Sequence, residues 1–229
     1  MTKKGRLLRL FLLKIPLLLV AFSILWVLIL KWMPVLVTPL MVSRSIEYRQ
    51  DDSFRTYKKW TRLENISPEM VKAVIASEDN LFDTHKGFDW KEIRIADEEY
   101  KSGKRLRGAS TITQQTARNV FLFPSNSVVR KALEAYFTVL IEWIWGKRRI
   151  MEVYLNVAEM GPGIYGAQAA ARQLFGKQAS DLTRREACLI TACLPSPLTR
   201  NAANPSSYVQ KRASQISNLE GKLKFPDWI

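Results

Sequence analysis

The stretch that decides the fold runs from Val128 to Trp145 and reads VVRKALEAYFTVLIEWIW. Its apolar residues recur at helical spacing, and only a narrow polar stripe interrupts them. This pattern predicts a long helix that lies at the centre of the fold and is mostly buried. The stripe contains Arg130, Lys131 and Glu134, which are spaced as an ordinary surface ion pair would be. Charges on a mostly buried helix usually have a partner or a ligand, so these three residues are candidates for function.

Signals for helix starts dominate the chain outside this stretch as well. A capping side chain followed by proline, or by an acidic residue three positions later, marks the first turn of a helix. Four places carry such a signal: Ser67-Pro68, Asp89 with Glu92, Thr183 with Glu186, and Asn204-Pro205. Alternating strand patterns are scarce, although a short hairpin remains compatible with the sequence. The sequence therefore predicts a mainly α fold.

The N-terminal part of the chain predicts a membrane anchor. No charged residue occurs from Ile15 to Leu30, and the apolar run continues past Lys31 to Val37. About 20 helical residues cross a bilayer core, so residues 15–37 are predicted to form one transmembrane helix. A cleaved signal peptide is the alternative, but the run is long for one and no clear A-x-A site follows.

Charge bias around this segment predicts the topology. Basic residues cluster in the tail of residues 1–14, which places the tail in the cytoplasm and the rest of the chain outside it. The protein is thus expected to be a single-pass protein of the cytoplasmic (inner) membrane, with a connector at 38–59 and one domain at 60–229. The formal net charge of +14 suits an anionic partner such as lipid headgroups, a phosphorylated substrate or nucleic acid. An external domain argues against nucleic acid.

The two cysteines, Cys188 and Cys193, are predicted to be buried free thiols. On a helix, residues five apart have Cα atoms about 8 to 9 Å from each other. That distance exceeds the reach of a disulfide, so both side chains are interpreted as small apolar residues.

The first candidate constellation is EDNLFDTHKG at residues 78–87, after an apolar helical run. If the helix continues, Glu78, Phe82 and His85 lie on one face. A carboxylate beside an aromatic ring can serve as a general base. The alternative is a helix end with solvated acids, and His85, the only histidine, is by itself more often structural than a ligand.

The second constellation is GASTITQQ at residues 108–115, followed by Arg118 and Asn119. Its hydroxyl and amide groups are neutral donors and acceptors that suit sugar hydroxyls. A capped helix start, with Ser110 or Thr111 as the cap, explains the same residues and is compatible with binding. The basic residues that precede it are Lys101, Lys104, Arg105 and Arg107.

These blocks, together with KRRI at 147–150, YLN at 154–156 and the segment 163–177, resemble the peptidoglycan glycosyltransferases in order and spacing. That module occurs in bifunctional penicillin-binding proteins and alone in monofunctional enzymes. The resemblance covers roughly residues 60–200. The chain length and the anchor match the monofunctional form, and the transpeptidase signatures S-x-x-K and K-T-G are absent from the sequence.

The resemblance implies a lysozyme-like helical domain with a small hydrophobic jaw near the membrane. The growing glycan, held as a lipid diphosphate, is the donor, and lipid II is the acceptor. Glu78 matches the base that deprotonates the GlcNAc 4-hydroxyl. Attack inverts the donor anomeric centre to a β-1,4 bond and releases undecaprenyl diphosphate.

The resemblance also implies roles for the other residues. Arg118, Arg130 and Lys131 match positions near the donor diphosphate, and Glu134 matches a second carboxylate that orients these cations. Residues expected to shape and orient the base are Asp79, Phe82 and His85. Residues expected to face the sugars and phosphates are Ser110, Thr111, Gln114, Gln115 and Asn119. Most members have Lys at the position of Arg118, and many have Arg at the position of Asn126, so part of the phosphate site differs here.

The implied partners are lipid II, the growing glycan, membrane lipids and other proteins of cell wall synthesis or division, with no nucleic acid. A divalent cation, Mg²⁺ or Mn²⁺, is compatible with the donor diphosphate, although the sequence contains no recognisable cluster of metal ligands. The nearest alternative function is a lysozyme-like lytic transglycosylase or hydrolase. The basic blocks argue against it, because a cleaved glycan has no diphosphate to hold. A membrane-tethered scaffold without activity is the other alternative.

Overall fold

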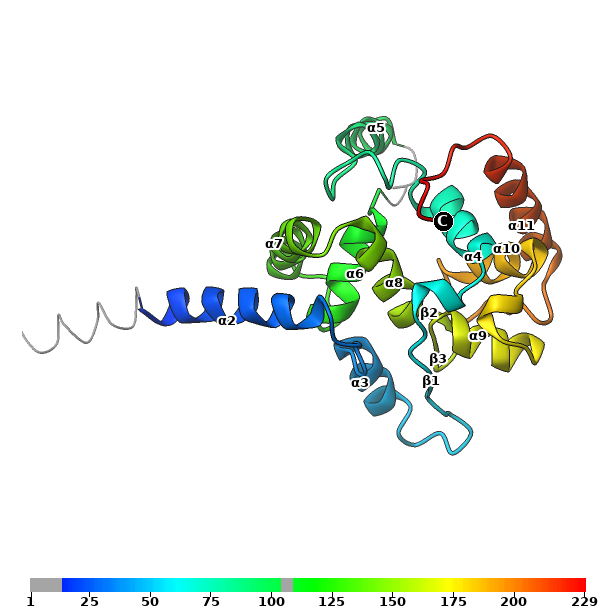
Figure 1. Cartoon of the computed structure of the whole chain (residues 1–229), viewed down its shortest axis with the longest axis horizontal. Helices are drawn as coiled ribbons and strands as arrows, with labels where there is room; N and C mark the ends of the chain where they lie inside the picture. The colour runs from blue at the N-terminus through cyan, green and yellow to red at the C-terminus, as the bar shows by residue number, and fades with distance from the viewer. Residues whose placement is uncertain (1–13, 104–108) are drawn as a thin grey trace, which may run out of the picture.

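The computed structural model describes residues 14–103 and 109–229, which form a mainly helical chain with one small sheet (Figure 1). The fold is therefore mainly α, as predicted. The helices are α2 (Ile15–Leu30), α3 (Pro39–Glu47), α4 (Pro68–Glu78), α5 (Trp90–Lys101), α6 (Ile112–Phe121), α7 (Val128–Ile144), α8 (Lys147–Val157), α9 (Ala167–Phe175), α10 (Arg184–Cys193) and α11 (Ser207–Glu220). The short elements are the 3-10 turns η2 (Leu63–Asn65) and η3 (Ala179–Asp181) and the strands β1 (Tyr57–Lys58), β2 (Glu159–Gly161) and β3 (Ile164–Tyr165).

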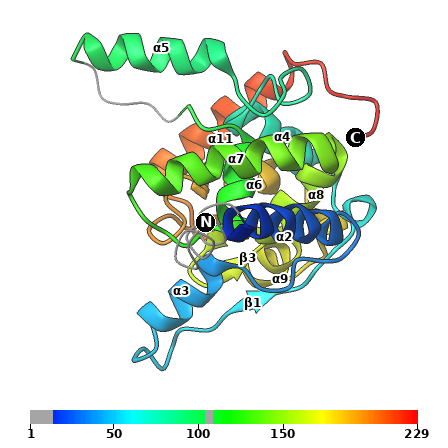
Figure 2. The same cartoon turned by 90° about the vertical axis from the view of Figure 1, so that its left-hand side faces the viewer.

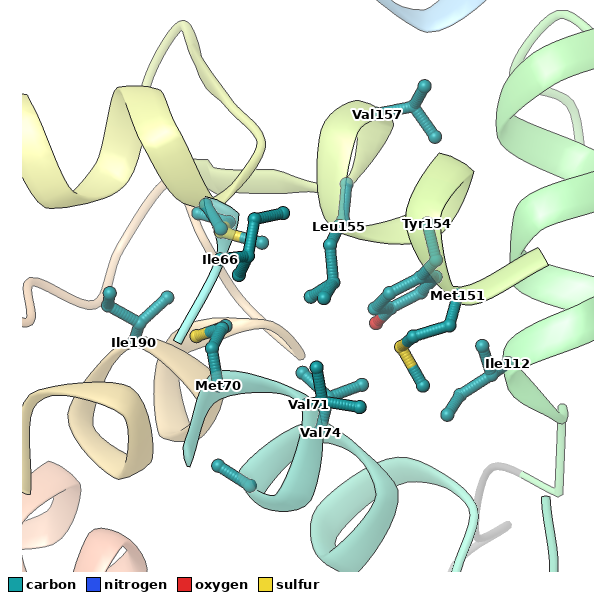
Figure 3. Close-up of a cluster of buried hydrophobic side chains, with 14 of the residues drawn as sticks. Ile66, Met70, Val71, Val74, Ile112, Met151, Tyr154, Leu155, Val157 and Ile190 are labelled. Carbon is teal, nitrogen blue, oxygen red and sulfur yellow. The ribbon is translucent and has the colours of Figure 1, made fainter. Parts of the chain in front are cut away.

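The core lies where α4, α6, α8 and α10 meet. Figure 3 shows their apolar side chains in one cluster. Met70 and Val74 of α4, Ile112 of α6, Leu155 of α8 and Ile190 of α10 are all fully buried. Burial of one such side chain stabilises the fold by about 1.5 to 3 kcal/mol. This shared core fixes the C-terminal end of α4 relative to the N-terminal end of α6, where candidate site residues lie.

Helix α7 is a surface helix, so the prediction that it would be central and mostly buried is wrong. Its buried residues are confined to one face that includes Glu134, Thr138 and Ile141. That face packs against α6, and α2 runs beside α7 (Figure 2). On the uncovered side, Val128 and Trp143 are 85% and 86% exposed. An apolar pattern indicates that a helix face prefers apolar surroundings. It does not show whether these surroundings are other parts of the same protein.

The predicted single helix over 15–37 is also wrong, because α2 ends at Leu30. Pro34 has no backbone N–H and disfavours helical geometry at Met33, so the chain passes through a turn and an extended segment. Thr38 then caps α3, which lies inside the expected connector. No helix within residues 14–103 and 109–229 combines the length and apolar character needed to cross a bilayer. Most of the predicted basic tail, residues 1–13, lies outside the described residues.

Three of the four predicted helix starts are confirmed. The side chains that accept the backbone N–H of the first turn are Ser67, Asp89 and Thr183. The fourth is wrong, since Ser206 and not Asn204 caps α11. The carboxamide of Asn201 accepts the N–H groups of Ala203 and Asn204, which holds Asn204 in the preceding turn.

The small sheet has the strand order β1-β3-β2 and includes the short hairpin that the sequence allowed. Strands β2 and β3 are antiparallel, and β1 pairs with β3 in parallel register. The turn between β2 and β3 requires glycine at position 163, where φ is +68° and a Cβ atom would lie 2.1 Å from the Arg55 carbonyl oxygen. The sheet thus ties residues 55–58, before the core helices, to residues 159–165.

Both cysteines are free and buried in α10, as predicted. Burial raises the pKa of the Cys193 thiol to about 11 and raises that of Cys188 as well. Thiols that stay protonated are unreactive, so they act as small core residues.

Candidate active site

Glu78 is the last residue of α4, and two neutral side chains hold its carboxylate. The hydroxyl of Ser77 donates to Oε1 at 3.0 Å, and Nε2 of Gln115 donates to Oε2 at 3.2 Å. Each carboxylate oxygen can accept about two hydrogen bonds. The group is half-buried and has room for a further donor. It is therefore placed to accept a proton.

The helix does not continue from Glu78 to His85, so the prediction of one shared helical face is wrong. Asp79 leaves the helix, with φ −166° and ψ 78°. Its buried carboxylate accepts from the N–H of Ile112 at 3.0 Å, across 33 residues of sequence. This bond joins the end of α4 to the start of α6 and replaces a further helical turn.

Asp79 also binds His85. Both carboxylate oxygens lie 2.9 Å from His85 Nε2, while the N–H of Gly87 donates to Nδ1 at 3.1 Å. Since Nδ1 accepts, the ring proton is on Nε2 and is donated to Asp79. Phe82 is fully buried and meets the His85 ring edge-on. Asp79, Phe82 and His85 thus fix the loop that follows Glu78.

The block at 110–115 begins α6, and Thr111 and Gln114 use their polar groups to cap the helix. The Thr111 hydroxyl accepts the Gln114 N–H, and the Gln114 side chain accepts the Thr111 N–H. The two bonds form a capping box. The Thr111 hydroxyl also donates to the Gly87 carbonyl at 2.7 Å. The capped helix start weighed from the sequence is confirmed. Gly108, Lys104, Arg105 and Arg107 lie outside the described residues.

Gln115 is the residue of this block that reaches Glu78. Its Nε2 also donates to the Ser110 carbonyl at 3.3 Å, while its Oε1 accepts from the Tyr154 hydroxyl at 3.2 Å. Burial raises the pKa of Tyr154 well above its ordinary value, the nearby Glu78 raises it further, and Arg118 opposes the shift. The phenol therefore stays protonated and fixes which end of the Gln115 amide faces Glu78.

A cavity of about 210 Å³ adjoins this group. Successive turns of α6 supply one wall, and elements that are distant in sequence supply the others. Its polar lining residues are Arg44 of α3, Gln115, Arg118 and Asn119 of α6, Tyr154 of α8 and Glu159 of β2. Arg118 and Asn119, both predicted site residues, thus share a cavity with the partner of Glu78.

Arg130, Lys131 and Glu134 form a second group on α7. The Glu134 side chain is fully buried, and its Oε2 accepts from Arg130 Nη1 at 2.5 Å. Lys131 Nζ binds the other oxygen, although half of the lysine side chain is exposed. The prediction that charges on this helix have partners is confirmed. None of the three lines the cavity.

The buried face of α7 links the two groups. Two turns after Glu134, Glu142 Oε1 accepts from Thr113 Oγ1 and from Lys147 Nζ, each at 2.6 Å. Lys147 Nζ also lies 4.6 Å from the centre of the Phe82 ring. These contacts hold α7 against α6 and the loop after Glu78.

Several residues of the site could not be predicted from the sequence. Arg212 of α11 donates to Ser77 Oγ at 3.2 Å, and Ser77 in turn donates to Glu78. Residues 77 and 212 are 135 positions apart. Arg44 and Glu159 were missed for the same reason. Pairs so far apart in the chain leave no periodic pattern in a single sequence.

The described residues contain no group of three or more His, Cys, Asp or Glu side chains that could hold a metal ion. A cation bound to the substrate diphosphate remains a prediction.

The half-buried carboxylate of Glu78 at a helix end, beside a cavity with cationic and amide side chains, is an arrangement suited to an enzyme of glycosyl transfer. The transglycosylase family model matches residues 46–219, and the chain belongs to this family. A biosynthetic peptidoglycan transglycosylase of Bacteroides thetaiotaomicron is 52% identical over 208 residues, or 90% of this chain and 84% of the relative. One from Caulobacter vibrioides is 48% identical, over 96% of this chain and 93% of the relative. One from Bdellovibrio bacteriovorus is 47% identical, over 95% and 88%.

Proposed function

We propose that this protein is a peptidoglycan glycosyltransferase that polymerises lipid II into β-1,4-linked glycan strands, with Glu78 as the general base. The observation that carries the proposal is the Glu78 carboxylate, held by Ser77 and Gln115 beside a cavity lined by Arg118 and Asn119. The names of the relatives support the choice of peptidoglycan and of synthesis.

The proposed reaction begins with the 4-hydroxyl of the acceptor GlcNAc. Glu78 takes the proton of that hydroxyl while its oxygen attacks C1 of the donor sugar. The bond from C1 to the diphosphate oxygen breaks, and undecaprenyl diphosphate leaves with the electron pair. Attack opposite the leaving group inverts C1 and gives a β-1,4 bond. Neutral donors on Glu78 suit this step, because they orient the carboxylate without a counter-ion that would occupy it.

Cations carry the other half of the proposed reaction. A diphosphate leaving group needs its developing charge stabilised more than it needs an acid. Arg118 lies in the cavity, and Arg130 and Lys131 are aligned by Glu134. A lytic enzyme, which is the alternative, would have no diphosphate for these cations to meet.

We also propose that the enzyme works at the cytoplasmic membrane, with the N-terminus inside and the catalytic domain outside. The uncovered apolar side chains of α2 and α7 support this, and these two helices would form the membrane-proximal jaw of a lysozyme-like domain. The most exposed of these side chains are Leu17, Leu18, Leu19, Phe22, Val128, Val129 and Trp143. Apolar surface of this kind marks an interaction site with a membrane or a protein.

The direct test incubates the purified full chain with lipid II and resolves the products on a gel. The proposal expects a ladder of glycan strands and no release of fragments from purified peptidoglycan. Fragment release without a ladder would identify a lytic enzyme instead. Parallel reactions with EDTA, and with Mg²⁺ or Mn²⁺ restored, test the predicted cation on the diphosphate. A C-terminal alkaline phosphatase fusion, expected to be active, tests the topology.

A further inference from the structure

One wall of the cavity comes from α3, a helix that precedes the core in sequence. Thr38, which caps α3, and Met41 in its first turn are 1% and 4% exposed. Leu40 and Arg44 of the same helix line the cavity together with residues of α6. Contacts between α3 and α6 are thus part of the boundary of the cavity that holds Arg118.

Arg44 connects α3 to a buried carboxylate on the sheet. Its Nε lies 3.3 Å from Glu159 Oε2, and its Nη1 lies 2.7 Å from Glu47 Oε2. The two carboxylates differ in burial, since the Glu159 side chain is 4% exposed and that of Glu47 is 52% exposed. Burial raises the pKa of Glu159, and Arg44 and the Tyr165 hydroxyl oppose the shift. Among the described residues, Arg44 is the ion-pair partner of Glu159.

This arrangement separates the tasks of the two arginines in the cavity. Arg44 is neutralised by two carboxylates, whereas Arg118 makes no ion pair with any described residue. Two carboxylates around the single guanidinium of Arg44 leave this cluster little attraction for an anionic ligand. A buried carboxylate that loses its cation is left uncompensated, which is costly. The Arg44–Glu159 pair is therefore suited to hold α3 in place, and Arg118 is left to meet the anion.

We infer that Arg44 and Glu159 are positioning residues whose ion pair fixes α3 as a wall of the substrate cavity. This inference rests on the proposed function for the identity of the substrate. The pair makes the segment before the core a part of the active site, so the position of α3 sets how well the lipid-linked substrate is bound. The chemistry at Glu78 does not involve the pair.

The test compares Arg44→Gln and Glu159→Gln with Glu47→Gln, which removes the exposed partner of the same arginine. In the first two variants, KM for lipid II should rise about tenfold while kcat stays within about twofold, because uniform binding is lost. Glu47→Gln should match wild type, since exposed pairs contribute little. Arg44→Lys, which keeps the charge, should recover most of the binding.

Hydrogen exchange on the same proteins measures how stably α3 is held in place. The amides of residues 42–47 should exchange about tenfold faster in Arg44→Gln and Glu159→Gln than in Glu47→Gln, while α8 stays protected. Unchanged exchange in α3, or fast exchange with an unchanged KM, would overturn the inference. If wild type makes no polymer from lipid II, the proposed function fails, and the exchange data still decide whether the pair holds α3.

Discussion

Glu78 and Glu134 are two carboxylates of one candidate site, and their surroundings are opposite. Glu78 is half-buried and is held by a hydroxyl and an amide. Glu134 is fully buried and is held by an arginine and a lysine. The donors to Glu78 are neutral and leave part of its carboxylate accessible, whereas the two cations on Glu134 occupy both of its carboxylate oxygens. This difference supports the roles that we propose, which are proton transfer for Glu78 and alignment of the cations for Glu134.

The largest effect should come from Glu134→Gln. It removes a buried charge between two cations, and breaking a buried pair costs about 3 to 5 kcal/mol. In urea titrations, the free energy of unfolding should decrease by an amount close to this cost. Polymerisation should decrease as well. Glu64→Gln is the control, because its pair with Arg148 is more than half exposed on both sides and should not change stability. Equal stability of the two variants would show that Glu134 is solvated in solution.

Arg130→Ala should cut polymerisation about tenfold to a hundredfold, because a charge-assisted contact to the leaving group contributes roughly 1.5 to 3 kcal/mol. Lys131→Ala should act in the same direction and less strongly, since half of this side chain is exposed. Helix content by circular dichroism should stay intact. Arg148→Ala removes an exposed cation of the next helix as a control. Full activity of both α7 variants would remove these cations from the mechanism.

Ser77→Ala tests whether the neutral donors to Glu78 matter for the reaction. It removes one donor to the carboxylate and the link to Arg212, so kcat should fall about threefold to tenfold while KM changes little. Ser180→Ala is a matched control, because Ser180 also donates to the carboxylate of the next residue, Asp181, at the surface. A kcat equal to that of the control would mean that Gln115 alone orients the base.

The smallest effect should come from Asn126→Arg, which introduces the cation that the family resemblance led us to expect at this position. Asn126 is exposed just before α7. Activity should hold or rise modestly, with a stronger salt dependence, because an exposed charge acts through a screened field. A clear loss of polymer in the gel assay would show that this loop works differently here.

Local chemistry could be predicted from the sequence, and long-range pairing could not. The caps Ser67 and Thr183 were predicted because donor and acceptor lie within one turn. The burial of α7 was predicted wrongly, because an apolar pattern does not show whether the rest of the protein covers the apolar side chains. The end of α4 was not predicted either, because Asp79 leaves the helix and accepts the N–H of Ile112, which is 33 residues away in the sequence. The bond from Arg212 is more distant still.

The site shows the same division. The three charges on α7 were predicted as a unit because they lie within four residues of each other. The block at 110–115 was predicted as both a helix start and a binding block, and the structure assigns Thr111 and Gln114 to the cap and brings Gln115 to Glu78. The walls of the cavity required the fold, because α3, α6 and β2 meet there only in three dimensions.

The most direct test of the account is Glu78→Gln, measured for lipid II polymerisation, lipid II binding and stability on one preparation. Glutamine keeps the size of the side chain and an acceptor but cannot take the proton. Removal of a general base costs about 10² to 10⁴-fold in rate. The account predicts no visible polymer, with binding and unfolding as in wild type, in contrast to the unstable Glu134→Gln. Polymer formed at a third or more of the wild-type rate by a folded Glu78→Gln enzyme would contradict it.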